Sequence, residues 1–506
     1  MLKSKGRSTR LIDAKGRRLI PGLNDSHLHA IRGGRFYSFE LRWDGVPSLK
    51  VALDRVREQA KRTPKGQWIR VIGGWTPHQF AERRMPTPKE LTLAAPDTPV
   101  YVLYLYSTAI VNRKGVEELG ITKHSMAPAG GRYELGADGE PTGRLLAEPN
   151  PTILYQTLAE LGEPSSEEKL SGTRHFYREL NRFGITSALD AGGGGHRFPA
   201  HYDGTARLAQ TADMPVRISF HLFAQEPGAE LKEFQDWVAA HEVQQNLAPT
   251  LAHGYELEGG GETLVTSAVD FENFRAPRPP LPERFRPELE RVTNLLISKR
   301  WSLRIHATYD ESASQILDVF ESVDRTERDA GRLGFKSVRW AFDHGETLGG
   351  TSIGRIKALG GGVMVQNRMA FAGEDFIERY GRAMAAHAPP LRALLDAGVP
   401  VGAGTDATRV SSYNPWLALY WMVSGKSVGG AQLLDERNRL TRDEALHLYT
   451  LGSAWFSNEE EVKGRIAVGQ FADFALLSHD YFAVPLETVR AIESVLTVVN
   501  GRVVYG

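Results

Sequence analysis

The sequence predicts an α/β protein whose main domain is a (β/α)8 TIM-like barrel, and two observations support this. From about residue 166 onward, short apolar stretches alternate with longer amphipathic stretches, as in the βα units of a parallel sheet. With the apolar run 19–29 as the first strand, the chain holds about eight such units. Polar residues also follow the predicted strands at their carboxyl ends, where such barrels build their active sites. These residues are His29, Asp190, His221, His306, His344, Asn367 and Asp406.

The two ends of the chain predict one small β-sandwich domain formed by residues 1–20 and 460–506. The N-terminal segment has a turn at 15–17 between short apolar pieces, and the tail is rich in strand-forming residues. Its Asn500-Gly501 pair lies between apolar runs, which is a strong signal for a β-hairpin. We expect the two segments to pair with each other.

Residues 30–165 are predicted to be an insertion after the first strand of a barrel domain that spans 21–459. This region lacks the repeated βα rhythm, so we expect it to be largely irregular. It nevertheless contains helical periodicity over 48–61 and a strand-like run at 100–105.

The later barrel strands are predicted in order along the chain. Helical periodicity over 166–183 ends at Gly184 and precedes the apolar strand 185–190. Helical stretches such as 286–299 and 311–322 separate the strands that follow. Those strands are predicted at 216–221, 303–306, 338–344, 363–367 and 399–406.

Composition and charge restrict the possible functions. The 506 residues include 61 Lys+Arg and 61 Asp+Glu, so no net charge attracts the chain to nucleic acid or an anionic membrane. Cysteine is absent, which excludes disulfides and thiolate chemistry. No apolar run approaches the roughly 20 residues of a membrane span, and residues 1–20 lack the core of a signal peptide. We therefore expect a cytoplasmic protein that acts on a small molecule, without nucleic-acid or membrane partners.

A set of histidines and one aspartate predicts a metal site. His27 and His29 share one face of a strand because their spacing is two residues, whereas His306 and His344 each end a separate strand. Each alone has an ordinary structural explanation, and Asp406 alone would suit a helix N-cap. Together at successive strand ends, they suit Zn²⁺, Mn²⁺, Fe²⁺ or Co²⁺.

Several motifs together resemble the amidohydrolase superfamily of metal-dependent hydrolases. They are Pro21-Gly22 with Asp25-Ser26-His27-Leu28-His29, His306-Ala307, Asp343-His344, Gly404-Thr405-Asp406-Ala407 and the tail segment 464–474. Gly73-Gly74-Trp75, Pro141-Thr142-Gly143 and residues 440–454 are similar to the branch of N-substituted formamide deformylases, amidohydrolase family 3. The resemblance covers essentially the whole chain.

This resemblance implies hydrolysis of a C–N bond of amide or formamide type by a metal-activated water. It implies one or two divalent ions, preferably zinc, with His27 and His29 on the more buried metal. His306 and His344 would bind metal from later strands. Asp406 would touch the metal and act as the general base toward the bound water. A homodimer is also expected.

The chain departs from the family pattern in places that affect the metal bridge. Many members carry a carboxylated lysine on the fourth strand, where our register places Glu256. Glu256 could bridge two metals directly, or it could be a solvated loop charge, and Glu148 is a second candidate bridge. The strand pair expected before Leu11 is missing, so the β-domain is incomplete or the start codon is assigned too late.

Four residues are candidate substrate contacts: Trp75, His196, His221 and Asn367. His196 follows a glycine run that lacks a phosphate-binding pattern, so we expect a flexible loop at the rim of the site. His221 could contact substrate or could be structural.

Two other functions remain open at the level of sequence. The same site could perform deamination or hydrolysis of an ester or lactone with hardly any change of mechanism. Alternatively, the chain could be a non-catalytic binding or regulatory protein on a degenerate barrel, because its metal bridge is altered.

Overall fold

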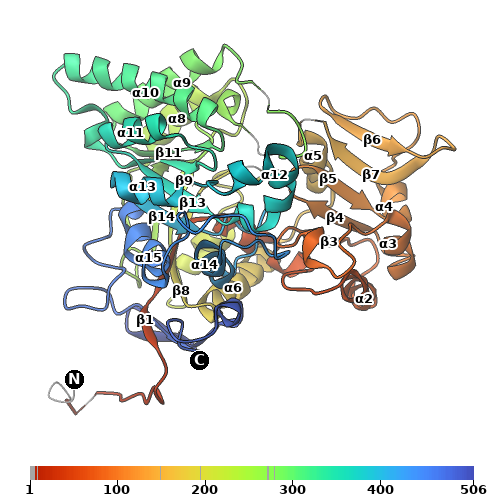
Figure 1. The fold of residues 1–506 in the computed structure, drawn as a ribbon, viewed down its shortest axis with the longest axis horizontal. Coiled ribbons are helices and arrows are strands. Elements are labelled where there is room, and N and C mark those ends of the chain that lie inside the picture. Colours follow the sequence, from red (N-terminus) through yellow and green to blue (C-terminus); the bar gives the residue numbers. More distant parts are fainter. Residues whose placement is uncertain (1–5, 8, 149, 194, 271–272, 279) are drawn as a thin grey trace.

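The computed structural model describes residues 6–7, 9–148, 150–193, 195–270, 273–278 and 280–506. Its central element is a nearly closed barrel of parallel strands, which confirms the predicted fold class (Figure 1). In spatial order these strands are β14 (Val401–Gly404), β13 (Gly362–Gln366), β12 (Trp340–His344), β11 (Ser302–Ala307), β10 (Tyr255–Gly260), β9 (Arg217–Leu222), β8 (Ile185–Asp190) and β2 (Leu23–Leu28).

The barrel closes where β14 meets β2, although no regular ladder joins these strands. The Asp406 N–H donates to the His27 carbonyl at 2.8 Å, and the His29 N–H donates to the Ala407 carbonyl at 3.1 Å. The Asp25 carboxylate reinforces this seam by accepting from the Thr405 N–H at 3.1 Å and from its hydroxyl at 2.7 Å. The seam therefore brings His27 of β2 and His29, which follows β2, next to Asp406.

Amphipathic helices pack around the barrel because their apolar faces cover its outer surface. A capping box illustrates how they start, since Ser165 caps α6 and Glu168 bonds back to the Ser165 N–H at 2.8 Å. The helices of this part of the chain are α1 (Ala30–Phe36), α6 (Ser166–Arg182), α7 (Asp203–Ala209), α8 (Glu230–Ala240), α9 (Phe285–Ser298), α10 (Asp310–Asp329), α11 (Gly350–Ala358), α12 (Arg368–Ala385), α13 (Leu391–Ala397), α14 (Pro415–Ser424) and α15 (Arg442–His447).

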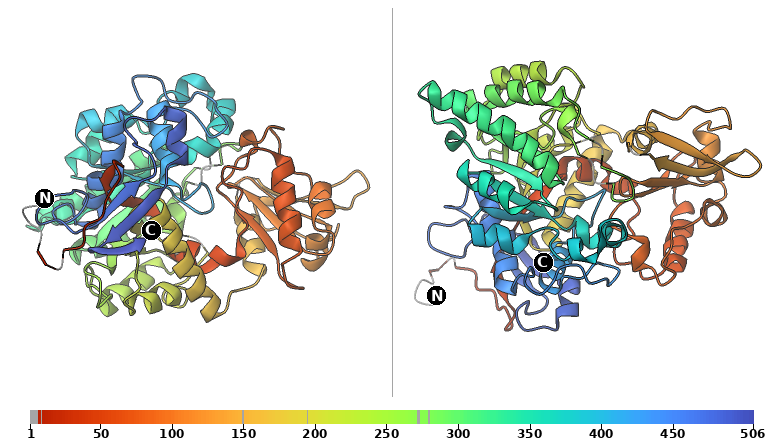
Figure 2. Two further views of the ribbon diagram at one scale, coloured as in Figure 1. Left: turned by 90° about the horizontal axis from the view of Figure 1, so that it is seen from below. Right: turned by 45° about the horizontal axis from the view of Figure 1, so that its top comes forward.

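The insertion forms a second lobe beside the barrel and is more regular than the sequence predicts (Figures 1 and 2). It contains a five-stranded mixed sheet with a separate apolar core on each face. Only one pair of its strands is parallel, so a search for repeated βα units does not detect it. The sheet order is β3 (Ile69–Ile72), β4 (Val100–Tyr104), β5 (Thr108–Val111), β7 (Pro141–Ala147) and β6 (Gly131–Leu135). Its helices are α2 (Leu49–Ala60), α3 (Pro88–Ala94), α4 (Arg113–Glu118) and α5 (Thr152–Glu160).

Both ends of the chain contribute to one four-stranded antiparallel sheet (Figure 2). Its order is β1 (Leu19–Pro21), β15 (Phe474–Leu477), β16 (Ser494–Val499) and β17 (Arg502–Tyr505). The predicted strand 19–29 is therefore two strands, one in this sheet and one in the barrel. The break falls at Gly22, which packs so closely on Thr186 that a Cβ would overlap its side chain.

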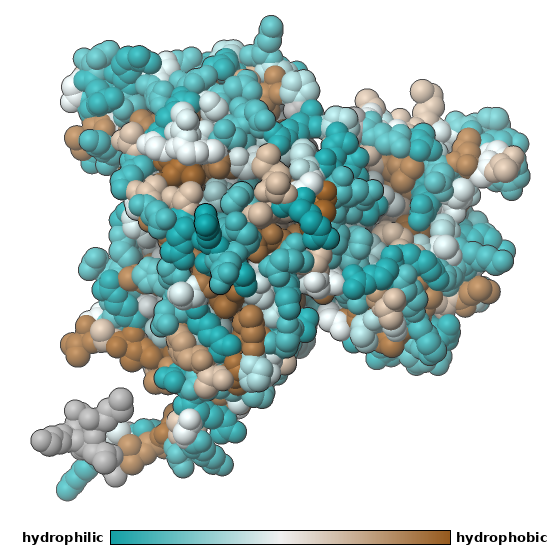
Figure 3. Space-filling view, viewed as in Figure 1, coloured by the Kyte–Doolittle hydropathy of each residue, from teal (hydrophilic) through white to brown (hydrophobic). Residues whose placement is uncertain are grey.

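The described part of the chain includes no helix that is both long and apolar enough to cross a bilayer. The face of the molecule in Figure 3 is mainly hydrophilic, with hydrophobic residues scattered over both lobes. The apolar side chains are concentrated instead in the barrel and insertion cores.

Candidate metal centre

Four histidines and two carboxylates converge at the carboxyl end of the barrel. Their ligand atoms form three overlapping groups, and within each group all atoms lie within 4.8 Å of one another. The groups are His27, His29 and Glu262; His27, His344 and Asp406; and Glu262, His306 and His344. All six residues are buried. The structure thus brings together the five residues predicted as core ligands and adds Glu262.

The two histidines of the β2 end both turn Nε2 toward Asp406. His29 Nε2 lies 3.0 Å from Asp406 Oδ1, and His27 Nε2 lies 3.4 Å from the same oxygen. His344 reaches this side of the cluster from β12, with Nδ1 at 3.9 Å from Asp406 Oδ2.

Glu262 occupies the middle of the cluster. Its Oε2 lies 3.7 Å from His27 Nε2, 3.5 Å from His306 Nδ1 and 3.5 Å from His344 Nε2. Its Oε1 lies 3.8 Å from His29 Nε2. One carboxylate therefore faces all four imidazoles, which is the position a bridging ligand needs.

Neither predicted bridge lies in this cluster, and the placement of Glu256 and Glu148 has to be corrected. Glu256 is the second residue of β10, at its amino end, where Oε1 lies 3.1 Å from His253 Nδ1. Glu148 is half-exposed and pairs with Arg132 at 2.9 Å. The error lies in the register, because β10 continues to Gly260 and its carboxyl end is marked by Glu262.

Groups behind the histidines determine which ring nitrogen faces the cluster. His27 Nδ1 contacts Asp343 Oδ1 at 2.8 Å, and His29 Nδ1 contacts the Gly192 carbonyl at 2.6 Å. His306 Nε2 lies 3.4 Å from Asp270 Oδ1. Carboxylates and carbonyls in this position are typical partners of metal-binding histidines, since they fix the tautomer and the ring orientation.

The electrostatics suit a cation at the centre of the cluster. Burial opposes ionisation of Asp406, but the imidazoles of His27, His29 and His344 outweigh it and hold the pKa well below its usual range. Burial and the charge of Arg368 lower the pKa of His344 to about 3, which keeps this imidazole neutral and its lone pair available.

Several buried polar atoms of the cluster lack a hydrogen bond to any described residue. They are His27 Nε2, both ring nitrogens of His344 and Asp406 Oδ2. Such atoms are costly to bury alone. A divalent cation would satisfy His27 Nε2, Asp406 Oδ2 and one ring nitrogen of His344 together, so the residues present fit a metal.

The predicted substrate contacts fall into two groups. Asn367 lies at the end of β13, and neither atom of its buried amide has a hydrogen-bond partner among the described residues. His221 is the penultimate residue of β9 in the barrel, where burial lowers its pKa to about 3. His196 lines a cavity beside the cluster. Trp75 does not lie at the site, because it packs in the insertion core and its Nε1 donates to the Leu103 carbonyl at 3.1 Å.

Sequence reasoning missed Arg368 and Asp270 as well as Glu262. Arg368 is buried, and its Nε lies 3.7 Å from Asp406 Oδ2 while its Nη2 donates to Glu346 at 2.7 Å. It directly follows Asn367, so its place at a strand end was a usable signal. Asp270 lies in a loop without a strand pattern, so no local signal marks it.

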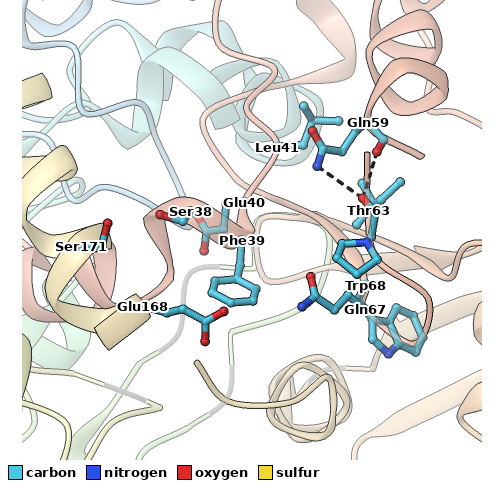
Figure 4. Close-up of a pocket in the computed structure, with 12 residues that line it drawn as sticks. Ser38, Phe39, Glu40, Leu41, Gln59, Thr63, Gln67, Trp68, Glu168 and Ser171 are labelled. Atoms are coloured by element: carbon cyan, nitrogen blue, oxygen red, sulfur yellow. Dashed lines mark hydrogen bonds between the residues drawn. The ribbon is translucent and has the colours of Figure 1, made fainter. Parts of the chain in front are cut away.

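A separate cavity of about 330 Å³ lies between the insertion and α6 (Figure 4). Phe39, Trp68 and Glu168 are among its lining residues, and none of the lining residues belongs to the metal cluster. It is therefore distinct from the candidate centre.

Comparisons with known proteins agree with the fold. A family model described as "Amidohydrolase family" matches residues 10–505. YtcJ of Bacillus subtilis, provisionally named an amidohydrolase, is 26% identical over 98% of this chain and 90% of its own length. The N-substituted formamide deformylase of Arthrobacter pascens is 24% identical over 98% and 90%. An uncharacterized metal-dependent hydrolase of Pyrococcus horikoshii shares the fold, with a TM-score of 0.65, 20% identity and coverage of 95% and 90%.

Proposed function

Because the chain belongs to the amidohydrolase family, we propose that it hydrolyses a C–N bond of amide or formamide type in a small organic substrate. The observation that carries this proposal is the buried cluster of four histidines and two carboxylates at the carboxyl end of the barrel. The similarity to a relative named N-substituted formamide deformylase supports the formamide type.

The cluster would hold one or two divalent ions, and Zn²⁺ suits its imidazole and carboxylate donors. His27, His29 and Glu262 form one possible ligand set, and Glu262, His306 and His344 form another. A bound ion would polarise the scissile carbonyl and acidify the attacking water. Because both sets include Glu262, this residue would bridge two ions.

Asp406 is the general base of the proposed reaction. Its Oδ2 makes no hydrogen bond to a described residue, and the low pKa of this carboxyl keeps it ionised at neutral pH. It would take a proton from water as the water oxygen bonds to the carbonyl carbon. It would then deliver that proton to the leaving nitrogen as the C–N bond breaks, so the products are a carboxylic acid and an amine.

Two neighbouring residues assist this step. Arg368 lies 3.7 Å from Asp406 Oδ2 and stabilises the carboxylate in its charged form. The Asn367 amide, which has no hydrogen-bond partner among described residues, would orient the substrate.

Substitution of the base tests the proposal. Asp406→Asn should lower kcat by about 10²–10⁴-fold while the fold and bound metal are retained, because only the proton acceptor is removed. Turnover of N-benzylformamide and a panel of simple amides would be measured beside elemental analysis. Asp310→Asn is the matched control, since Asp310 begins α10 outside the metal cluster and accepts from the Gly349 N–H. Full activity in metal-loaded Asp406→Asn would refute the assignment.

A further inference from the structure

A cavity of about 390 Å³ is lined in part by residues that follow the carboxyl ends of the barrel strands, and its size is adequate for part of a small ligand. The loops that follow β8 and β9 line one side, and α1 and α5 line the other. Gly193 packs against the centre, and Gly195 lines the cavity. A Cβ on Gly193 would lie 2.9 Å from His29 Cε1, and a Cβ on Gly195 would lie 2.8 Å from Arg409 Nη2. Gly195 of the cavity wall is thus only two positions along the chain from Gly193, which packs against a predicted metal ligand.

The wall beside this loop carries a concentration of buried positive charge. Arg409 and Arg35 line the cavity with exposures of only 8% and 2%, and the nearby Arg32 is 5% exposed. Burial and the charge of Arg32 lower the pKa of Arg409 to about 10. A depressed guanidinium pKa means that a negative charge placed beside Arg409 would be favourable.

Carboxyl groups near these arginines offset part of their charge, because Glu40 interacts with both Arg409 and Arg32. Glu163 accepts from Arg35 Nε at 3.1 Å. Asp190 accepts from the backbone N–H groups of Ile31 at 2.7 Å and Gly192 at 2.9 Å. The charge of Arg32 also acts on Asp190, yet the pKa of Arg409 stays lowered, so these carboxyl groups compensate only part of the cost of burying Arg409.

Two further side chains shape the wall for a planar anion. The Arg409 guanidinium lies 4.6 Å from the centre of the Tyr155 ring, which restricts its orientation. His196 is 3% exposed, and its Nε2 contacts the Tyr202 hydroxyl at 3.2 Å while its Nδ1 has no partner among described residues. Burial, followed by the charge of Arg32, lowers the pKa of His196 well below its usual value, so a neutral ring offers one N–H to a ligand.

We propose that this cavity binds a carboxylate of the substrate, with Arg409 as its main partner and His196 as a second donor. The substrate class is then an N-formyl or N-acyl compound that carries a carboxylate away from the scissile bond. A guanidinium suits this group because its two parallel N–H donors match the two carboxylate oxygens. The nature of the scissile bond rests on the proposed function, whereas recognition of the carboxylate does not.

A matched pair of ligands tests the inference on the metal-loaded full chain. N-(4-carboxybenzyl)formamide differs from N-benzylformamide only by the carboxylate, and binding of both would be measured by calorimetry beside turnover. We expect the native protein to bind the carboxylate compound at least about tenfold more tightly. Arg409→Met should reduce this preference to about twofold or less. Arg409→Gln serves the same purpose if the first variant does not fold.

Arg197→Met is the control, because Arg197 lines the same cavity but is exposed and paired with Glu226 at 2.6 Å. It should keep the full preference. Equal binding of the two ligands by the native protein, a preference that survives loss of Arg409, or an equal loss in Arg197→Met would each overturn the inference. Selective binding of the carboxylate compound without hydrolysis of either formamide would refute the proposed formamide cleavage alone.

Discussion

Glu262 is the single residue on which the shape of the candidate centre depends most. Its two oxygens lie between 3.5 and 3.8 Å from ring nitrogens of all four histidines. If it bridges two ions, Glu262→Gln should reduce the metal content from about two ions to one or fewer, as measured by elemental analysis. Glu256→Gln and Glu148→Gln are the controls and should keep the native content. An unchanged content in Glu262→Gln would exclude the bridge.

Glu258 is a second residue with a measurable consequence, at the other end of the barrel interior. It is 1% exposed, and neither carboxylate oxygen has a hydrogen-bond partner among described residues. Burial, and then the charges of Glu459 and Glu256, raise the pKa of Glu258 well above its usual range, while Lys463 opposes them. The folded protein therefore keeps a proton on Glu258 that the unfolded chain loses near its ordinary pKa.

The sign of the pH dependence follows from this proton. Above the ordinary pKa of a glutamate, Glu258 binds a proton in the folded state that the unfolded state has lost, so its contribution to the free energy of unfolding should fall as pH rises. Glu258→Gln should flatten this fall in urea unfolding. His253, whose pKa is raised mainly by its bond to Glu256, adds a similar decrease that the variant should retain. Equal slopes in the native protein and Glu258→Gln would contradict the assignment, and Glu148→Gln is the exposed control.

The sequence best predicted the positions of those cluster residues that lie at strand ends. His306, His344 and Asp406 follow apolar runs directly, so the geometry of a parallel barrel brings them together without further information. Glu262 lies two residues beyond β10, and only the period of two from Glu256 and Glu258 points to it. Trp75 was misplaced because a tryptophan beside a glycine turn fits a core as well as a pocket.

At the scale of elements, the seam between β2 and β14 positions half of the cluster. Gly404 is central to it, because a Cβ there would overlap the backbone of His27 and lie 2.8 Å from Asp25 Oδ1. Gly404→Ala should therefore separate the two strands, weaken metal binding and abolish most activity. Overpacking of this kind costs about 1–3 kcal/mol of unfolding free energy.

A helical glycine provides the control for this substitution. A Cβ on Gly354 in α11 would meet nothing within 4 Å, so Gly354→Ala should be neutral or stabilise the protein by about 0.5–1 kcal/mol. Chemical unfolding would measure the stability of both variants, and elemental analysis would measure their metal content. Normal metal content in Gly404→Ala would show that the seam does not position the ligands.

The strands and helices of the barrel were predictable because each one repeats the same local sequence pattern. The pairing of strands that are distant in the sequence was not predictable. The split of the predicted strand 19–29 depends on β1 pairing with β15, in the register Leu19 with Leu476. The insertion sheet likewise pairs strands in an order that no local period encodes. Tertiary pairing, and not strand propensity, decides these features.

At the scale of the whole molecule, the insertion packs on the loop that follows Asp406. Arg42 of the insertion donates to the Thr408 carbonyl at 3.3 Å. Tyr104 of β4 donates to Asp375 of α12 at 2.9 Å. Gly73 makes the closest approach, because a Cβ there would overlap the Arg409 carbonyl. The second lobe is thus in contact with the segment that carries both the proposed base and the proposed anion-binding arginine.

This contact predicts that a change in the insertion impairs the barrel site. Gly73→Ala should lower kcat/KM by about tenfold or more, because displacement of the loop by even 1 Å misplaces Asp406 and Arg409. Gly45→Ala separates this effect from backbone strain. Gly45 has a φ of +65° and Gly73 a φ of +70°, so alanine at either position adopts a left-handed backbone that costs about 1–2 kcal/mol. The two positions differ in their surroundings, because a Cβ on Gly45 meets nothing within 4 Å. Thermal melting should show destabilisation in both variants and more of it in Gly73→Ala because of the overlap, whereas kinetics should show a loss only in Gly73→Ala. If both variants kept native kinetics, the insertion would cover the barrel without positioning the loop that follows β14.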